Sequence, residues 1–214
     1  MKLNFATPFC KICFKEMYST SFSSLLGKTI PICNDCLSKM NPIFMRYRID
    51  NIKTTTCYYY NEKIQEMIYR FKGCFDYELG ELFLVNQKPF LRMLFHSYYL
   101  VPSPSYSARD SERGFNHVQV IFSSIGKGYL TAIKKNDDVK QSDLNAKQRR
   151  NIGNHLSWNE DVDVFGTKIL FVDDLITTGS TARACCKLIK DHGAKEVQIL
   201  SLARTISLED RKKK

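Results

Sequence analysis

The sequence predicts an α/β fold in which a parallel sheet is flanked by helices, preceded by a small N-terminal module of a different kind. From residue 98 onward, short apolar runs alternate with helical patterns. Such alternation indicates parallel strands joined by helical crossovers. Four cysteines lie within the first 36 residues, in two C-x-x-C pairs. These observations divide the chain into a cysteine-rich head and a larger α/β part.

The composition is that of a globular protein with an excess of positive charge. The 214 residues include 32 Lys and Arg and 22 Asp and Glu, giving a formal net charge of +10. No run approaches the roughly 18 consecutive apolar residues of a membrane helix, and residues 1–14 lack a secretion signal. We therefore expect no transmembrane segment and a cytoplasmic location, either free or peripheral at the inner face of the membrane. The charge favours an anionic partner, although a surface tuned for solubility explains it equally well.

The cysteines of the head have the spacing of a zinc site. Cys10 and Cys13 form one pair, Cys33 and Cys36 the other, and 19 residues separate the pairs. This lies within the span of about 15 to 20 residues typical of four-cysteine zinc sites. Four thiolates leave no open position, so the predicted Zn²⁺ is structural and supplies most of the folding free energy of a small module. A redox C-x-x-C is the alternative, but it usually occurs once and beside a βαβ pattern.

The other four cysteines are predicted to be buried as small hydrophobic residues of the core. They are Cys57, Cys74, Cys185 and Cys186.

The middle of the chain reads as a strand followed by amphipathic helices. Residues 54–60 are rich in β-formers, and an apolar stripe from Ile64 to Phe71 predicts a helix whose charges, Lys63, Arg70 and Lys72, form a solvated face. A second helical pattern covers residues 79–95, interrupted near Pro89. We therefore predict a zinc-ribbon-like module at 1–45, connecting strand and helices that form a hood or linker at 46–97, and the α/β domain at 98–208.

The α/β domain is predicted from its alternating segments. They are strands near residues 98–101, 129–135, 168–172 and 196–203, with helices at 115–125 and after residue 180.

The residues expected to carry chemistry follow the strand at 168–172. Asp173 and Asp174 come directly after this buried run, at the strand end where ligands of open α/β sheets bind. Hydroxyl side chains and a glycine then occupy the start of a helix, whose unpaired N–H groups favour a phosphate. Carboxylates suit ribose hydroxyls and the loop suits a phosphate, so the ligand predicted is a ribose 5-phosphate. An ordinary Ser/Thr-capped helix would explain the hydroxyls but not the two acids.

Residues 169–181, ILFVDDLITTGST, resemble the signature of type I phosphoribosyltransferases at every position. The resemblance implies a fold of that type, with Asp173 and Asp174 as catalytic residues that hold the ribose hydroxyls of phosphoribosyl pyrophosphate, together with Mg²⁺. A response-regulator receiver is a weaker alternative, because its acid pair stands near the start of its domain. The residues implied to wrap the 5-phosphate are Thr177, Thr178, Gly179, Ser180 and Thr181.

Two upstream segments suit a pyrophosphate. A turn at residues 100–104 (LVPSP) contains Ser103, and residues 113–116 (RGFN) begin with Arg113. Backbone donors beside an arginine favour anion binding. Residues 134–154 form a polar, basic stretch long enough to be a functional loop over this site.

The head, both upstream motifs, the QSDLNAKQRRN loop and the signature together resemble the ComF family, in family order. The loop departs from the family pattern around Asn154, so its register stays open. The resemblance implies a protein of natural transformation that binds phosphoribosyl pyrophosphate or a nucleotide, near incoming single-stranded DNA, with an uptake helicase as a partner. The alternative is a binding module without turnover that engages single-stranded DNA or that helicase. Interleaved aromatic and basic residues, such as Phe9, Phe14 and residues 46–48, suit this alternative, but the aromatic residues also suit a small core of the head.

Overall fold

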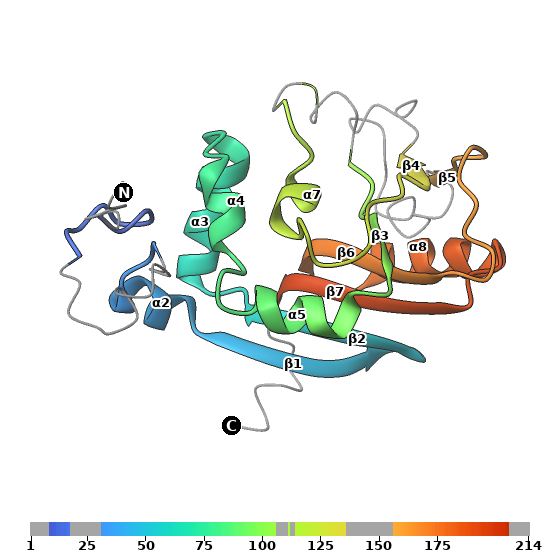
Figure 1. Cartoon of the computed structure of the whole chain (residues 1–214), viewed down its shortest axis with the longest axis horizontal. Helices are drawn as coiled ribbons and strands as arrows, with labels where there is room; N and C mark the ends of the chain where they lie inside the picture. Colours follow the sequence, from blue (N-terminus) through green and yellow to red (C-terminus); the bar gives the residue numbers. More distant parts are fainter. Residues whose placement is uncertain (1–8, 18–30, 106–110, 112–113, 136–155, 206–214) are drawn as a thin grey trace, which may run out of the picture.

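One five-stranded sheet organises the protein (Figure 1). The computed structural model describes residues 9–17, 31–105, 111, 114–135 and 156–205. The strand order is β1-β2-β7-β6-β3, in which β2, β7, β6 and β3 run parallel and β1 is antiparallel at one edge. The predicted α/β class is confirmed, and the antiparallel edge strand is an addition. The strands are β1 (Pro42–Ile49), β2 (Ile52–Tyr59), β3 (Tyr99–Pro102), β6 (Lys168–Ile176) and β7 (Glu196–Arg204).

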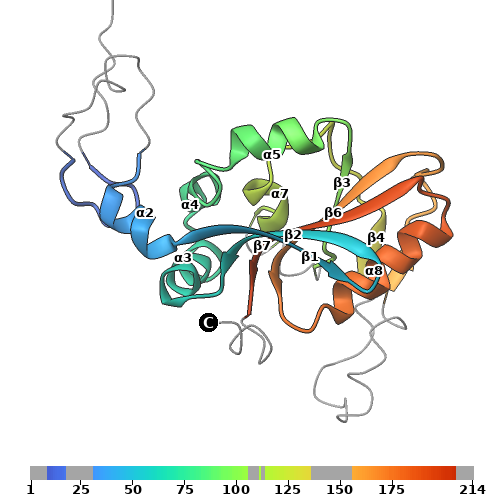
Figure 2. The ribbon, with the colours of Figure 1, turned by 90° about the horizontal axis from the view of Figure 1, so that it is seen from below.

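Helices cover both faces of this sheet, with α8 lying opposite α5 and α7 (Figure 2). One face packs on the cluster that contains Leu170, Val172 and Leu200, and the opposite face packs on the cluster that contains Phe171 and Ile199. Alternate residues of the buried strand β6 therefore supply two separate cores. The helices are α3 (Glu62–Gly73), α4 (Glu78–Leu82), α5 (Lys88–Phe95) and α7 (His117–Ile121) on the first face and α8 (Ser180–Asp191) on the second.

Most predicted elements occur where the sequence places them. The helix predicted from the stripe at Ile64 to Phe71 is α3, and Asn61 caps it by accepting a hydrogen bond from the Ile64 amide at 2.9 Å. The pattern at 79–95 is divided into α4 and α5, with Pro89 in the first turn of α5, where the missing N–H costs no helical hydrogen bond.

The run at residues 129–135 differs from the prediction. Hydrogen bonds from the Leu100 amide to the Gly128 carbonyl and from the Leu130 amide to the Leu100 carbonyl extend the sheet briefly beyond β3. The chain then leaves the sheet, and β4 (Ile133–Lys135) pairs with β5 (Leu156–Trp158) in a separate antiparallel pair. Only Ala132 and Ile133 of this run are buried hydrophobic residues, too few for a strand covered on both faces.

The head continues the main core. Cys10, Ile12 and Met40 belong to the same buried cluster as Ile64 and Phe71 of α3. The strands β1 and β2, which lie largely in the segment predicted to connect head and domain, belong to the main sheet. The division at residues 45 and 97 stays a prediction. In the described part of the chain, no helix combines the length and apolar character needed to cross a membrane.

Candidate functional site

The two predicted acids lie where the sheet opens between β3 and β6. The strand β3 ends at Pro102, opposite Val172, whereas β6 continues alongside β7 to Ile176. Asp173 and Asp174 therefore extend past the end of β3. The helix after β3 is α7 on one face, and the helix after β6 is α8 on the other. Adjacent strands whose helices leave in opposite directions form a topological switch point, where open α/β sheets bind ligands.

Asp174 is a buried carboxylate with two basic partners. Lys72 Nζ of α3 lies 2.6 Å from Asp174 Oδ2, and His117 Nε2 of α7 lies 3.4 Å from Asp174 Oδ1. Burial disfavours ionisation of Asp174, but the hydrogen bond with His117 and the charge of Lys72 outweigh it and hold the pKa of its carboxyl below the ordinary value. A carboxylate has about four acceptor sites, so Asp174 can still accept bonds from a ligand.

Asp173 has the opposite electrostatic character. Burial, and then the negative charge of Asp174, raise the pKa of the Asp173 carboxyl to about 8, against opposing contributions that include a hydrogen bond with Ser103. Its Oδ1 accepts the amide of Asp174 at 3.0 Å. At neutral pH the site therefore combines a protonated carboxyl, which can donate, with an ionised one, which accepts.

The segment predicted to bind phosphate surrounds the start of α8. Thr177 and Thr178 are exposed, and Gly179, with φ of 75°, is an N-cap that has no side chain to cap the helix. The Ser180 amide donates to Thr178 Oγ1 at 3.4 Å, and the amides that follow have no such partner at the N-cap. The hydroxyls of Thr178 and Ser180 lie 2.8 Å apart. An uncapped N-terminus of a 12-residue helix presents unpaired N–H groups and the positive end of the helix dipole to this loop. The arrangement can bind an anion.

The predicted residues on the pyrophosphate side are only partly visible. Ser103 follows β3, its amide donates to the Val172 carbonyl at 2.8 Å, and its side chain bonds Asp173. Arg113 and most of the basic loop at 134–154 lie outside the described residues. The roles of Ser103 and Arg113 toward a ligand stay predictions.

Sequence reasoning missed two residues of the site and misinterpreted one helix face. His117 was not singled out, although it directly follows the RGFN motif. Lys72 was expected to be solvated, but it is half-buried and pairs with Asp174. Arg70 donates to the Ile12 carbonyl at 2.8 Å and pairs with Asp76 at 2.9 Å. The prediction of a solvated face on α3 is therefore wrong at Lys72 and Arg70. The helical period shows which residues are neighbours on the same helix, but not which residues of other elements lie against them.

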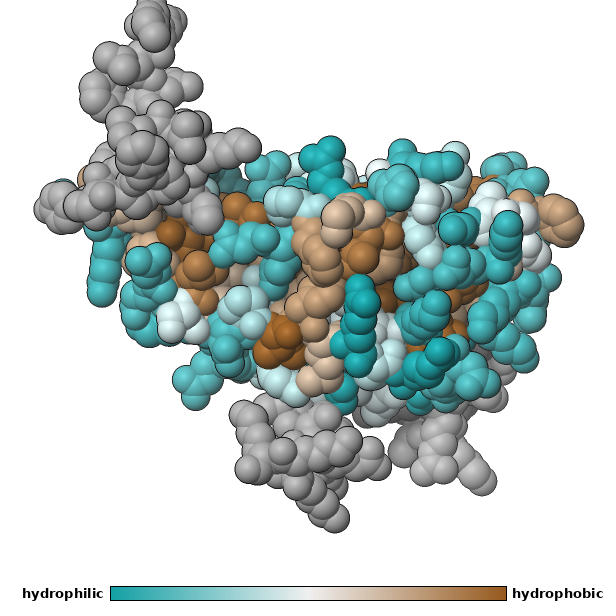
Figure 3. Space-filling model, turned by 60° about the horizontal axis from the view of Figure 1, so that its bottom comes forward, coloured by the Kyte–Doolittle hydropathy of each residue, from teal (hydrophilic) through white to brown (hydrophobic). Residues whose placement is uncertain are grey.

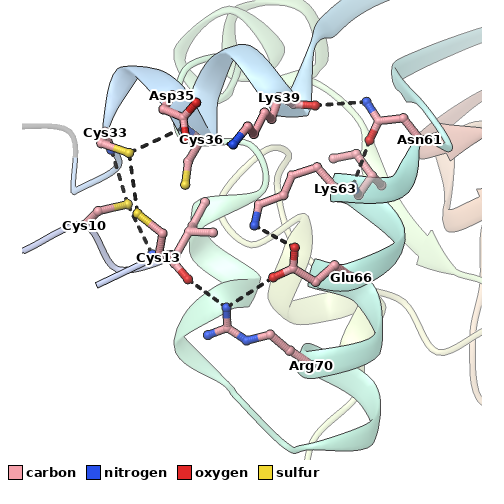
Figure 4. Close-up of polar contacts among 12 residues, drawn as sticks. Cys10, Cys13, Cys33, Asp35, Cys36, Lys39, Asn61, Lys63, Glu66 and Arg70 are labelled. Carbon is pink, nitrogen blue, oxygen red and sulfur yellow. Dashed lines mark hydrogen bonds and ion pairs between the residues drawn. The ribbon is translucent and has the colours of Figure 1, made fainter. Parts of the chain in front are cut away.

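The four cysteines of the head meet in a cluster that could hold zinc (Figure 4). Their sulfur atoms all lie within 4.8 Å of one another. The sulfurs of Cys13 and Cys33 are 3.7 Å apart, close to the ~3.8 Å expected for two corners of a tetrahedron with Zn–S bonds of about 2.3 Å. The amides of Ile12 and Cys33 point at Cys10 Sγ, and the Cys36 amide points at Cys33 Sγ. Such donors stabilise thiolates, so the residues fit the ion.

The remaining cysteines divide by burial. Cys57, Cys185 and Cys186 are fully buried, as predicted, whereas Cys74 is exposed after α3 and its predicted burial is wrong. Of the aromatic residues considered for the head, Phe9 and Phe14 are also exposed, at 46% and 68%. These two side chains therefore do not form a core of the head.

Comparison with known proteins shows what the chain is similar to. Residues 114–214 match the phosphoribosyl transferase domain model, so this part of the chain is similar to that domain. A solved hypoxanthine phosphoribosyltransferase from Staphylococcus aureus aligns with 60% of this chain and 64% of its own, with 12% identity and a TM-score of 0.37.

Two competence proteins resemble nearly the whole chain. Competence protein ComFC of Streptococcus pneumoniae (strain ATCC BAA-255 / R6) is 28% identical over 91% of this chain and 99% of its own length. Competence protein F of Haemophilus influenzae is 28% identical over 91% of this chain and 90% of its own length. The resemblance to the ComF family predicted from the sequence is thereby confirmed.

The protonation of Asp173 should make stability depend on pH. Its folded-state pKa lies above the value of about 4 in an unfolded chain, so its stabilising contribution is present below pH ~4 and is lost as pH rises through about 8. Asp173→Asn should remove this loss. From pH 5 to pH 8.5, the free energy of unfolding of the native protein should fall by several kcal/mol more than that of the variant. Urea unfolding at both pH values measures the difference.

The matched control is Asp161→Asn, which changes an exposed acid. It should keep the pH dependence of the native protein. Equal pH dependence in the native and Asp173→Asn proteins would show that Asp173 is ionised throughout this range.

Proposed function

We propose that this protein binds phosphoribosyl pyrophosphate at the switch point at the ends of β3 and β6, which we call the crevice, and that it acts in the uptake of DNA during natural transformation. The observation that carries the ligand is the juxtaposition of Asp173 and Asp174 with the uncapped N-terminus of α8. The names of the two competence relatives support the biological role. A nucleotide, which shares the ribose 5-phosphate, is the other ligand of this site.

Each part of the crevice has a role in this proposal. The N–H groups and hydroxyls of residues 177–181 hold the 5-phosphate, while Asp173 and Asp174 bind ribose hydroxyls as donor and acceptor. Ser103 and Arg113 are the residues proposed to bind the pyrophosphate. In a transfer reaction, an acceptor bonds to C1 of the ribose and loses its proton as the bond between C1 and pyrophosphate breaks, and the buried carboxylate of Asp174 stabilises the developing positive charge. Mg²⁺, when bound, would neutralise the leaving pyrophosphate.

A second candidate is a module that binds ligands without turnover and contacts single-stranded DNA or a helicase. The observation in its favour is the exposure of Phe9 and Phe14 on the head. Lys11 and Lys15 lie beside them in the sequence, and aromatic and basic side chains together suit stacking on bases and contact with phosphates. In this second candidate, a ligand bound in the crevice would regulate the contact with single-stranded DNA or the helicase. The predicted cytoplasmic location is compatible with both candidates.

Binding of phosphoribosyl pyrophosphate should depend on the acid pair. In calorimetric titration with Mg²⁺, Asp173→Ala/Asp174→Ala should weaken binding at least about tenfold, since charge-assisted hydrogen bonds to the ribose are lost. The matched control, Glu160→Ala/Asp161→Ala, removes two adjacent exposed acids and should bind as the native protein does.

The outcomes of this titration separate the two candidates. Absence of binding by the folded native protein would contradict the proposed ligand. If the native protein instead binds an oligonucleotide with affinity that falls steeply with salt, the second candidate gains support.

We also propose that the cysteine cluster binds a structural zinc ion. Purified protein should contain about one zinc per chain, and Cys36→Ser should lose it, because a tetrahedral site needs all four ligands. The variant should also lose stability, on the order of several kcal/mol, since the metal contributes to folding of the head. Mass spectrometry of metal content and thermal unfolding measure both effects.

Cys74→Ser is the matched control, because Cys74 is exposed and lies outside the cluster. It should retain both zinc and stability. Native protein that remains free of zinc after refolding with the ion would refute the proposed site.

A further inference from the structure

A second hollow lies away from the crevice, between the edge of the sheet and α5. Its volume is about 470 Å³, within the range of roughly 300–1,000 Å³ typical of small-molecule sites. Figure 3 looks toward the underside of Figure 1, where β1 and α5 lie, and shows hydrophobic surface bordered by hydrophilic side chains. The hollow is lined by Arg46, Tyr47, Arg48, Lys53, Thr54, Thr55, Leu94, Phe95 and Gln198.

The charges of this hollow are all positive and unusually placed. Arg48 of β1 is the direct cross-strand partner of Lys53 of β2, and Arg46 is the partner of Thr55. Side chains of paired residues share a face, so three cations gather on one side of the β1–β2 pair, and like charges directly opposite destabilise a sheet. Within the described part of the chain, none of the three forms an ion pair.

Nearby contacts do not neutralise these cations. Arg48 Nη1 donates to the Asn51 carbonyl at 2.9 Å, and the guanidinium of Arg46 lies 5.5 Å from the centre of the Phe44 ring. Glu196 is the nearby acid, and its pKa is lowered first by the hydrogen bond from Gln198 and last by the charge of Lys53. Its carboxylate lies 3.7 Å from Lys168. An anion in the hollow would offset the repulsion between the cations.

The other walls indicate what the anion carries. Leu94 and the buried Phe95, at the end of α5, supply an apolar surface. Gln198 donates its Nε2 to Tyr98 Oη and to Glu196 Oε1, both at 2.8 Å, so its amide orientation is fixed with the oxygen left to accept. A nucleotide requires these three contacts: cations for its phosphate, an apolar wall for its flat ring and an acceptor for a ring amino group.

We propose that the hollow bounded by β1, β2, β7 and α5 is a second ligand site, separate from the crevice at β3 and β6, and that it binds a nucleoside monophosphate. The phosphate contacts Arg46, Arg48 and Lys53, and the base lies against Leu94 and Phe95. This site is independent of the proposed binding of phosphoribosyl pyrophosphate, because the two share no lining residue.

Calorimetric titration of the full chain with adenosine monophosphate tests the proposal. Arg46→Gln/Lys53→Gln should weaken binding at least about tenfold, since two charged contacts are lost. Both side chains are exposed, so the variant should fold, which its circular dichroism verifies. Lys187→Gln/Lys195→Gln removes the same charge from exposed positions elsewhere and should bind like the native protein. Asp173→Ala/Asp174→Ala removes any binding of a nucleotide in the crevice and should retain the binding to the hollow.

Four results would overturn the proposal. The first is no binding of adenosine monophosphate by the native protein. The second is binding that survives Arg46→Gln/Lys53→Gln but is lost with the acid pair, which would place the nucleotide in the crevice. The third is inorganic phosphate binding as tightly as adenosine monophosphate, which would indicate a simple anion site. The fourth is binding of an oligothymidylate without binding of the mononucleotide, which would indicate a strand-binding surface.

Discussion

The burial of two adjacent carboxyl groups in β6 is the constraint on which the site depends. Neighbouring residues of a strand point to opposite faces, so one set of partners cannot serve both acids. Lys72 and His117 hold Asp174 ionised, whereas Asp173 keeps its proton. A buried ion pair contributes little net stability, but removal of one partner leaves an uncompensated charge. The positions of α3 and α7 are thus fixed by charge as well as by apolar packing.

Sequence could predict the parts of this site that are local. The buried strand, the acids and the phosphate loop are consecutive, and the cysteine pairs have a spacing set by tetrahedral geometry. The pairing of Lys72 with Asp174 could not be predicted from the sequence, because 102 residues separate the two and a helical pattern shows only which residues are apolar. The strand β1 was missed for a related reason: Arg46 and Arg48 make it look like a solvated segment until its pairing with β2 is known.

The head is coupled to the site through α3. Arg70, which donates to the Ile12 carbonyl between Cys10 and Cys13, lies two residues before Lys72, which bonds Asp174. One helix therefore carries contacts to both the cysteine cluster and the acid pair. Loss of the proposed metal would remove support from the end of α3 that places Lys72, even though four thiolates leave no open coordination position for a substrate.

The edge hairpin formed by β1 and β2 likewise contacts one site and lines another, the phosphate loop and the second hollow. Its tip lies against the phosphate loop, where Asp50 is 4.0 Å from Arg183 and a Cβ on Gly179 would lie 3.2 Å from Ile49. Charges on an edge strand also discourage pairing with other chains, which explains the presence of cations on β1. Edge protection does not require Arg48 and Lys53 to face each other beside an apolar wall, because that arrangement adds repulsion without covering the exposed edge. Ligand binding accounts for the placement of these cations, and protection of the edge accounts only for their number.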